Sequence, residues 1–335
     1  MPVRLANPTR RYVVKKKYRK PVVLELCAGG GGQALGLERA GFEHTAVVEI
    51  DSRFCQTLRF NRPHWNVIQQ DIRTLSGKAF CGVDLIAGGV PCPPFSFAGK
   101  QLGEKDERDL FPTALRIIDE ARPRAVLLEN VPGFMSAKFT EYRNKLQSQL
   151  EKMEYTVFMT ILNASDFEVP QLRPRFVLVG LQKEYAEYFT WPEKKLARNT
   201  VGERLRDLMT ENGWKHADVW AKKADEIGPT IVGGSMKHGG PDLGPTRARA
   251  QWLKLSVNGI GIANEAPSAE EPENHIPKIT VKMAARIQGF PDSWHFVGPK
   301  TTAYKQVGNA FPPPVAHAVG LAIKRALESK DDENS

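Results

Sequence analysis

Cysteine is scarce in this chain, and long apolar runs are absent. The 335 residues include four cysteines, at positions 27, 55, 81 and 92, which form no Cys-x-x-Cys pair and have no histidine partner nearby. This spacing argues against a structural zinc site and against a disulfide framework. No apolar stretch approaches the roughly 20 residues that a membrane-spanning helix needs, and no signal peptide is visible. We therefore expect a soluble, cytoplasmic protein that holds no metal and stays off the membrane.

Basic residues are unevenly distributed along the chain. The formal net charge is +9, and residues 1–20 contain eight lysines or arginines and no acidic residue. Subtracting these eight charges leaves the rest of the chain at +1. A basic arm can grip the phosphates of a nucleic acid, but a solvated terminus has the same composition. The charge alone leaves both interpretations of residues 1–20 open.

Apolar strands and short helices alternate through the first half of the chain. We expect helices at 33–40, at 52–61 with Ser52 as the N-cap, at 110–121 and at 139–153. The expected strands are 21–26, 45–49, 66–69, 83–87 and 125–128. This alternation is typical of an α/β protein with a doubly wound, mostly parallel sheet, whose ligands bind at the carboxyl ends of the strands.

The alternation stops after Gly180, which predicts a second, smaller domain. Residues 181–275 contain scattered tryptophans, glycines and prolines with nearly balanced charges. From residue 276 the chain regains helical character, so we expect residues 276–328 to return to the main domain formed by residues 21–180. The predicted organisation is therefore an arm at 1–20, a discontinuous main domain, and an inserted domain at 181–275.

A glycine-rich turn and two acidic residues follow the first three expected strands. The turn is formed by residues 29–32, Glu49 ends the second strand, and Asp71-Ile72 follows the third. A carboxylate can accept from both hydroxyls of a ribose, and an acid beside an aliphatic side chain suits an adenine. The turn alone is a weak signal, because its spacing differs from the Gly-x-Gly-x-x-Gly of nicotinamide-binding proteins.

One cysteine and one glutamate lie where they could perform covalent chemistry. Cys92 lies in a proline-rich loop, and Glu129 ends the fifth expected strand. A thiolate can add to an electron-poor heteroaromatic ring while an acid neutralises charge that develops on a ring nitrogen. Burial as a small apolar residue is the commoner role of a free cysteine. The flanking prolines, which restrict the orientation of the thiol, favour the role of nucleophile for Cys92.

Five motifs, taken in order, resemble the cytosine-C5 DNA methyltransferase family over nearly the whole chain. They are residues 24–32, 88–96, Glu129-Asn130-Val131, 171–175 and 306–309. The resemblance implies a class I methyltransferase fold and transfer of a methyl group from S-adenosyl-L-methionine to C5 of a cytosine flipped out of double-stranded DNA. The chain departs from the family at Cys27, where the family usually has phenylalanine, and at Glu25, where it usually has aspartate. The family's Pro-Cys-Gln is here Pro-Cys-Pro.

The resemblance also implies a role for individual residues. Cys92 would add to cytosine C6, Glu129 would act at N3 and the exocyclic amine, Arg175 would meet the O2 atom, and Arg173 the backbone near it. The residues implied to bind S-adenosyl-L-methionine are Cys27, Ala28, Gly29, Gly31, Glu49, Ile50, Asp71, Ile72, Pro91, Leu110, Asn309 and Ala310. Ser96 would bind the target phosphate, and residues 181–275 would recognise the target sequence through Lys237, Arg247 and Arg249.

The resemblance further implies a bacterial, monomeric, DNA-associated enzyme of a restriction-modification system or an orphan methyltransferase. Whether a cognate restriction endonuclease accompanies it is left open. A transfer-RNA cytosine methyltransferase is the nearest rival, but the Cys-Phe-Thr run typical of those enzymes is absent. A Rossmann oxidoreductase would not explain Cys92 together with the late Asn309 motif. A binding module without catalysis would not need Cys92, Glu129 and both arginines.

Overall fold

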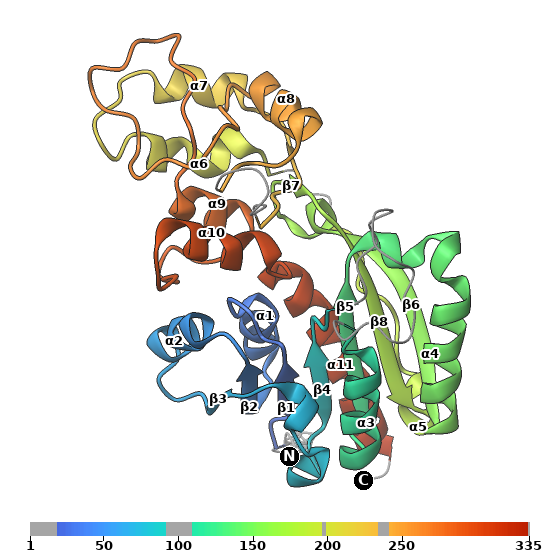
Figure 1. Cartoon of the computed structure of the whole chain (residues 1–335). Coiled ribbons are helices and arrows are strands. Elements are labelled where there is room, and N and C mark those ends of the chain that lie inside the picture. Colours follow the sequence, from blue (N-terminus) through green and yellow to red (C-terminus); the bar gives the residue numbers. More distant parts are fainter. Residues whose placement is uncertain (1–18, 92–108, 196–198, 234–240, 334–335) are drawn as a thin grey trace, which may run out of the picture.

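A seven-stranded sheet forms the centre of the larger lobe in the computed structural model (Figure 1). The structure describes residues 19–91, 109–195, 199–233 and 241–333. Most of the predicted basic arm lies outside these ranges. Its last two residues are described: Arg19 pairs with the buried Asp84 at 2.8 Å, and Lys20 pairs with Glu43 at 2.9 Å.

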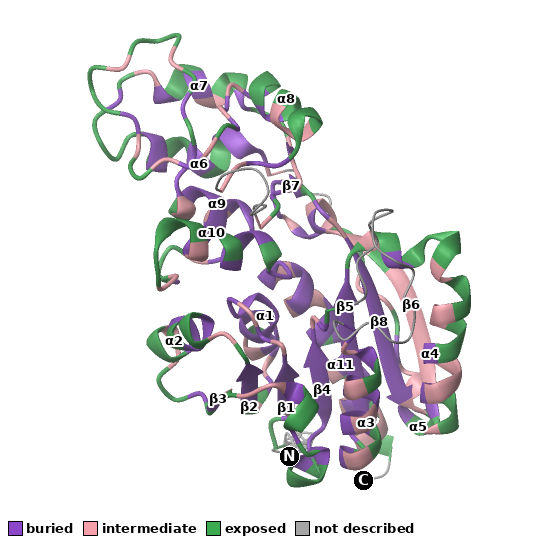
Figure 2. Ribbon diagram, viewed as in Figure 1, coloured by how far each residue is buried: buried purple, intermediate pink, exposed green. Residues whose placement is uncertain are grey.

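The order of the strands confirms the predicted mostly parallel α/β sheet. The strands run β3-β2-β1-β4-β5-β8-β6 across the sheet, with the first five parallel and β8 antiparallel to both of its neighbours. Their bounds are β1 Val22–Leu26, β2 Glu43–Glu49, β3 Val67–Gln69, β4 Leu85–Gly88, β5 Ala125–Asn130, β6 Tyr155–Asn163 and β8 Pro174–Gln182. The central strands are buried on both faces (Figure 2), which is why they appear in the sequence as continuous apolar runs.

Helices cover both faces of the sheet. On one face α1 (Gly32–Ala40) packs along α11 (Pro313–Glu333), with α2 (Ser52–Asn61) beside them. On the other face lie α3 (Phe111–Ala121) and α4 (Thr140–Lys152). The predicted N-cap of α2 is wrong: the carboxylate of Asp51 accepts from the Arg53 N–H at 2.9 Å, and Ser52 is the first helical residue. The short α5 (Lys183–Ala186) follows β8.

A smaller lobe stands on the sheet domain (Figure 1). It contains α6 (Val201–Met209), α7 (Ala217–Lys223) and α8 (Thr246–Lys254) around a core with three buried tryptophans, Trp214, Trp220 and Trp252. A two-stranded sheet of β7 (Gln171–Leu172) and β9 (Gly228–Pro229) lies at its base.

The segment after residue 276 does not return directly to the sheet. Helix α9 (Val281–Ile287) packs on α6 and α10 (Lys300–Asn309) packs on α9, so both share the core of the smaller lobe. Helix α11 packs along α1 on the sheet domain, and Gln306 of α10 lies against Gly30 of the glycine-rich turn. The boundary at residue 276 stays a prediction, and the packing places α9 and α10 between the two lobes. In the described part of the chain, no helix combines the length and hydrophobicity needed to span a bilayer.

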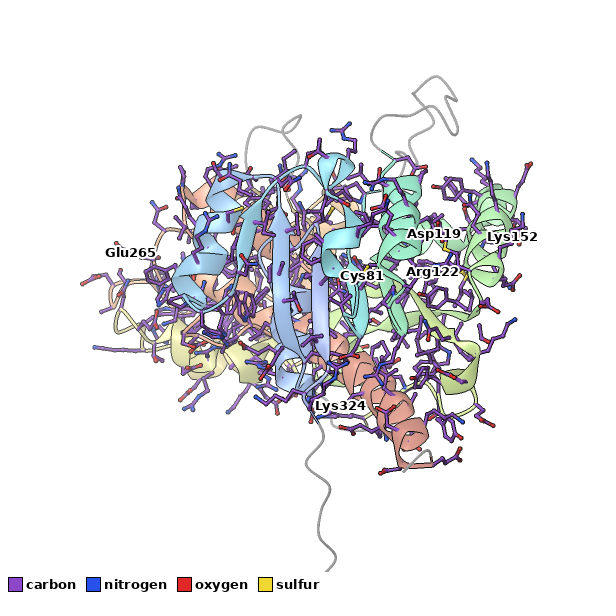
Figure 3. The ribbon with its side chains drawn as sticks, turned by 90° about the horizontal axis from the view of Figure 1, so that it is seen from below. Cys81, Asp119, Arg122, Lys152, Glu265 and Lys324 are labelled. Carbon is purple, nitrogen blue, oxygen red and sulfur yellow. The ribbon has the colours of Figure 1, made fainter. Side chains whose placement is uncertain are left out.

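The opposite end of the sheet carries ordinary surface features. Cys81 precedes β4, and the ion pair of Asp119 with Arg122 precedes β5. Cys81, Asp119 and Arg122 are labelled in Figure 3. Cys81 is exposed there, away from the ligand-binding edge that the topology predicts.

Candidate active site

A cavity of about 630 Å³ lies at the carboxyl ends of β1, β2, β3, β4 and β5. Its position is the one that a doubly wound sheet predicts for a ligand. Of the predicted cofactor residues it is lined by Cys27, Ala28, Gly29, Glu49, Ile50, Asp71, Ile72, Pro91, Leu110, Asn309 and Ala310. Glu129 and Arg175 line the same cavity. One space therefore joins the predicted cofactor residues to two of the predicted catalytic residues.

Gly31 is the one predicted cofactor residue that does not line the cavity. It precedes α1 with a φ of 84°, a left-handed conformation that side chains rarely adopt. A Cβ atom at this position would lie 2.8 Å from both Leu58 and Trp294. Gly31 therefore shapes the turn and brings α1 close to its neighbours, and its predicted contact with the cofactor stays a prediction.

Glu49 fixes the turn through its buried carboxylate. Its Oε2 atom accepts from the Gly29 N–H at 2.7 Å, and its Oε1 atom accepts from the N–H groups of Ile50 and Asp51, both at 2.9 Å. A carboxylate has about four positions for hydrogen-bond donors. Three are used here, so Glu49 can still accept from one ligand hydroxyl.

Asp71 and Cys27 complete the same side of the cavity. Hydrogen bonds from the Arg73 side chain and backbone lower the pKa of Asp71, whose Oδ2 atom lies 2.6 Å from Arg73 Nη2. Burial raises the pKa of the Cys27 thiol to about 12. Cys27 is therefore a neutral, soft surface for a ligand and is unsuited to act as a nucleophile.

Glu25 is a lining residue to which the sequence assigned no role. Its side chain is fully buried, and neither carboxylate oxygen has a hydrogen-bond partner among the described residues. Burial raises its pKa to about 8. The only signal in the sequence was its place at the head of the glycine motif.

Glu129 and Arg175 form a buried ion pair, with Arg175 Nε 2.9 Å from Glu129 Oε1. Strand β8 runs antiparallel beside β5, which sets Arg175 next to the end of β5 where Glu129 lies. Burial raises the pKa of the Glu129 carboxyl, and Arg175 opposes this rise. An acid that can hold a proton and a guanidinium therefore face the same cavity.

Hydrogen bonds hold the two ends of the proline-rich loop to each other and to the end of β5. Asn130 Nδ2 donates to the Val90 carbonyl at 2.9 Å, and the Leu110 N–H donates to the Pro91 carbonyl at 3.0 Å. Asn130 was given no individual role by the sequence, although it belongs to a quoted motif. Cys92 and Ser96 lie outside the described residues, so their roles as nucleophile and phosphate contact stay predictions.

Arg173 does not line the cavity. Its guanidinium is fully buried and donates to the carbonyls of Ile231, Gly308 (2.6 Å) and Ala310 (3.0 Å). In the described residues the Arg173 guanidinium therefore contacts the protein's own backbone, and its predicted place near the cytosine stays a prediction.

The predicted DNA-reading arginines lie on α8. Arg247 is exposed in the first turn, and Arg249 donates to Thr246 Oγ1 at 3.2 Å. Lys237 lies outside the described residues. The two arginines are thus on a rigid element of the smaller lobe, while what they contact stays a prediction.

The strand order and a cavity at the strand ends define a class I methyltransferase. The family model described as C-5 cytosine-specific DNA methylase matches residues 22–325, and the chain belongs to this family. It is 52% identical over 314 residues to the type II methyltransferase M.NaeI of Lentzea aerocolonigenes, covering 92% of this chain and 76% of the relative. It is 50% identical over 311 residues to M.NgoMIV of Neisseria gonorrhoeae, covering 92% and 98%.

Solved structures show the same fold at low sequence identity. A prophage-encoded DNA modification methyltransferase from E. coli superposes with a TM-score of 0.65 at 24% identity, covering 92% of this chain and 99% of the other. A DNMT2 variant of Spodoptera frugiperda gives 0.63 at 18% identity, covering 91% and 99%. The protein is therefore an enzyme, a C5-cytosine DNA methyltransferase.

Proposed function

We propose that this enzyme transfers a methyl group from S-adenosyl-L-methionine to C5 of a cytosine flipped out of a specific duplex DNA sequence. The observation that carries the proposal is the shared cavity, in which Glu129 and Arg175 face the residues suited to an adenosine. Target atoms inside a duplex are out of reach of such a cavity, so the base must leave the stack.

The cavity's residues fit this cofactor. Glu49 has one acceptor position left for a ribose hydroxyl, and Ile72 offers an apolar surface beside Asp71 for the adenine. In the same cavity, the Glu25 carboxyl has no hydrogen-bond partner within the part of the chain that the structure describes, which suits a cationic group. When bound, S-adenosyl-L-methionine supplies an electrophilic methyl group.

The chain's own residues activate the cytosine. The Cys92 thiolate forms a bond to C6, and the ring electrons move toward N3 and the O2 atom. Glu129 gives its proton to N3, and Arg175 stabilises charge at O2. C5 becomes an enamine-like nucleophile that accepts the methyl group. A base or water then removes the C5 proton, the C6–sulfur bond breaks to restore the thiolate, and N3 returns its proton to Glu129.

The smaller lobe is proposed to choose the target sequence, because the cavity residues are committed to cofactor and cytosine. The relatives described above are type II methyltransferases, which supports a role in a type II restriction-modification system, with a cognate endonuclease as a partner. Arginines on a helix can read guanine edges in the major groove.

The test is methylation with tritiated S-adenosyl-L-methionine offered with duplex DNA, transfer RNA or no nucleic acid. Recovery of the label on C5 of DNA cytosine supports the proposal. Label on transfer RNA, or on neither nucleic acid, contradicts it.

A further inference from the structure

A buried network of two glutamines joins distant segments behind the cavity. Gln171 Nε2 donates to Gln288 Oε1 at 2.6 Å, and the Ile231 N–H donates to Gln171 Oε1 at 2.6 Å. Gln288 Nε2 donates to the carbonyls of Val307 and Ala310, both at 3.0 Å. Both glutamines are fully buried, so each lost partner would leave a polar group without water to replace it.

Arg173 binds the same segments from the other side. It donates to the Ile231 carbonyl and to the carbonyls of Gly308 and Ala310. Ile231 is therefore held at both of its backbone polar groups by side chains that flank the start of β8. Buried networks in which the members are paired favour one arrangement of the chain over others.

The two segments that the network holds are one wall of the cavity. Residues 231–233 and 308–310 all line it. They touch backbone to backbone, because a Cβ atom on Gly308 would lie 2.5 Å from the Gly233 Cα atom, and one on Gly233 would clash with Asn309 Oδ1. Only this close approach brings both segments to the cavity surface.

The same wall leads directly into the smaller lobe. The described chain stops at Gly233 and resumes at Pro241. There the Asp242 carbonyl accepts from the Tyr304 hydroxyl of α10 at 3.0 Å, and the Leu243 side chain is fully buried. Residues 231–233 therefore both line the cavity and lie between two parts of the lobe proposed to bind DNA, α6 and α7 before them and α8 after them.

We propose that Gln171, Arg173 and Gln288 are positioning residues that couple the cofactor wall to the recognition lobe, whose helices precede and follow residues 231–233 in the chain. Cofactor and DNA then each favour the arrangement that the other needs, so each raises the affinity for the other by the same factor. This inference rests on the proposed function.

The central test compares Gln288→Leu with the wild type. Leucine keeps much of the volume but leaves the Gln171 amide N–H without its acceptor and removes one of the two donors to each of the Val307 and Ala310 carbonyls. Duplex DNA carrying the methylated site is titrated by fluorescence anisotropy with and without saturating S-adenosylhomocysteine. The affinity of the protein for S-adenosylhomocysteine is measured by calorimetry, whose stoichiometry counts the folded fraction.

For the wild type, saturating S-adenosylhomocysteine should tighten DNA binding at least fivefold. In Gln288→Leu the ratio of DNA affinities with and without S-adenosylhomocysteine should fall to near one. S-adenosylhomocysteine should bind at least tenfold more weakly, and the KM for S-adenosyl-L-methionine should rise at a nearly unchanged kcat. A fall only in binding stoichiometry or kcat, with the ratio kept, would show a merely structural role and overturn the proposal. A wild-type ratio of one would overturn it while leaving methylation, and hence the proposed function, intact.

A second variant keeps the test decisive if Gln288→Leu does not fold. Gly233→Ala leaves the network in place but moves residues 231–233 away from Asn309. It should also bring the ratio of DNA affinities with and without S-adenosylhomocysteine to near one. Gly180→Ala is the matched control, because its Cβ atom would meet Val126 at an ordinary 3.5 Å, and it should keep the wild-type ratio. Equal ratios in Gly233→Ala and Gly180→Ala would refute the coupling.

Discussion

Replacing Glu25 by glutamine should remove a pH-dependent loss of stability from the unliganded enzyme. Glu25 is fully buried at the cavity and has no hydrogen-bond partner among the described residues, and burial raises its pKa from an ordinary 4.5 to about 8. The folded protein therefore holds a proton that the unfolded chain releases. Glutamine has nearly the same shape and cannot ionise, so it mimics the protonated acid.

The sign and size of the effect follow from these pKa values. Below pH 4.5 both states are protonated, and Glu25 imposes no penalty. As the pH rises from 4.5 toward 8 the unfolded state is favoured, at about 1.4 kcal/mol for each pH step, and above about 8 the penalty stays constant. At pH 7, about 2.5 steps above the unfolded pKa, the penalty is about 3 kcal/mol. Glu25→Gln should recover an amount of that order at pH 7 and little at pH 4.5.

The assay is urea unfolding of wild type and variants without cofactor at several values between pH 5 and 8. The difference in unfolding free energy between Glu25→Gln and wild type should grow steadily with pH. Glu265→Gln is the matched control, because this acid is exposed on the smaller lobe (Figure 3), and its difference should stay flat. If the difference in unfolding free energy between Glu25→Gln and wild type also stays flat with pH, the raised pKa assigned to Glu25 is refuted.

Five further substitutions address the chemistry and the recognition. Glu129→Gln should lower kcat by a factor that corresponds to about 3 kcal/mol in the activation barrier, since it removes the proton held at the cavity. Calorimetry should show little change in the affinity for S-adenosylhomocysteine. Asn130→Ala removes the hydrogen bond that joins β5 to the start of the nucleophile loop. Single-turnover methylation should slow about tenfold, which corresponds to about 1.4 kcal/mol, while the cofactor affinity is kept. Alanine at Lys237, Arg247 or Arg249 should relax one base position by about 1–3 kcal/mol in bisulfite sequencing of a methylated random-site library.

Each of these has an outcome that contradicts it. Unchanged turnover in Glu129→Gln would remove this acid from the mechanism. Wild-type single-turnover rates in Asn130→Ala would show that the loop is positioned by other contacts. If all three basic variants keep the wild-type site and lose only overall rate and salt dependence, these residues grip phosphates and the base readers lie elsewhere.

The sequence predicted the parts of the fold that depend on local pattern. The first five strands are continuous apolar runs, and their carboxyl ends carry the glycine turn, Glu49, Asp71 and Glu129, so topology alone gathers these residues. The N-cap of α2 was misplaced by one residue because Asp51 and Ser52 are both good caps, and only the geometry chooses between them.

Distant contacts were beyond the reach of the sequence. Arg173 and Arg175 are two residues apart and look equivalent. Yet Arg175 meets Glu129 across the sheet, whereas Arg173 is captured by carbonyls that belong to residues 231, 308 and 310. The partnerless state of Glu25 likewise follows from packing around the cavity rather than from its neighbours in the chain.

The most direct test of the catalytic account is covalent trapping on a duplex whose target cytosine is 5-fluorocytosine. Fluorine at C5 cannot leave as a proton does, so the bond between sulfur and C6 should persist after methyl transfer. With S-adenosyl-L-methionine, wild type should form a complex that survives denaturing electrophoresis, and mass spectrometry should place the adduct on Cys92. Cys92→Ser should form none while still binding DNA and S-adenosylhomocysteine. An adduct in Cys92→Ser, or one mapped to another residue, would contradict the account.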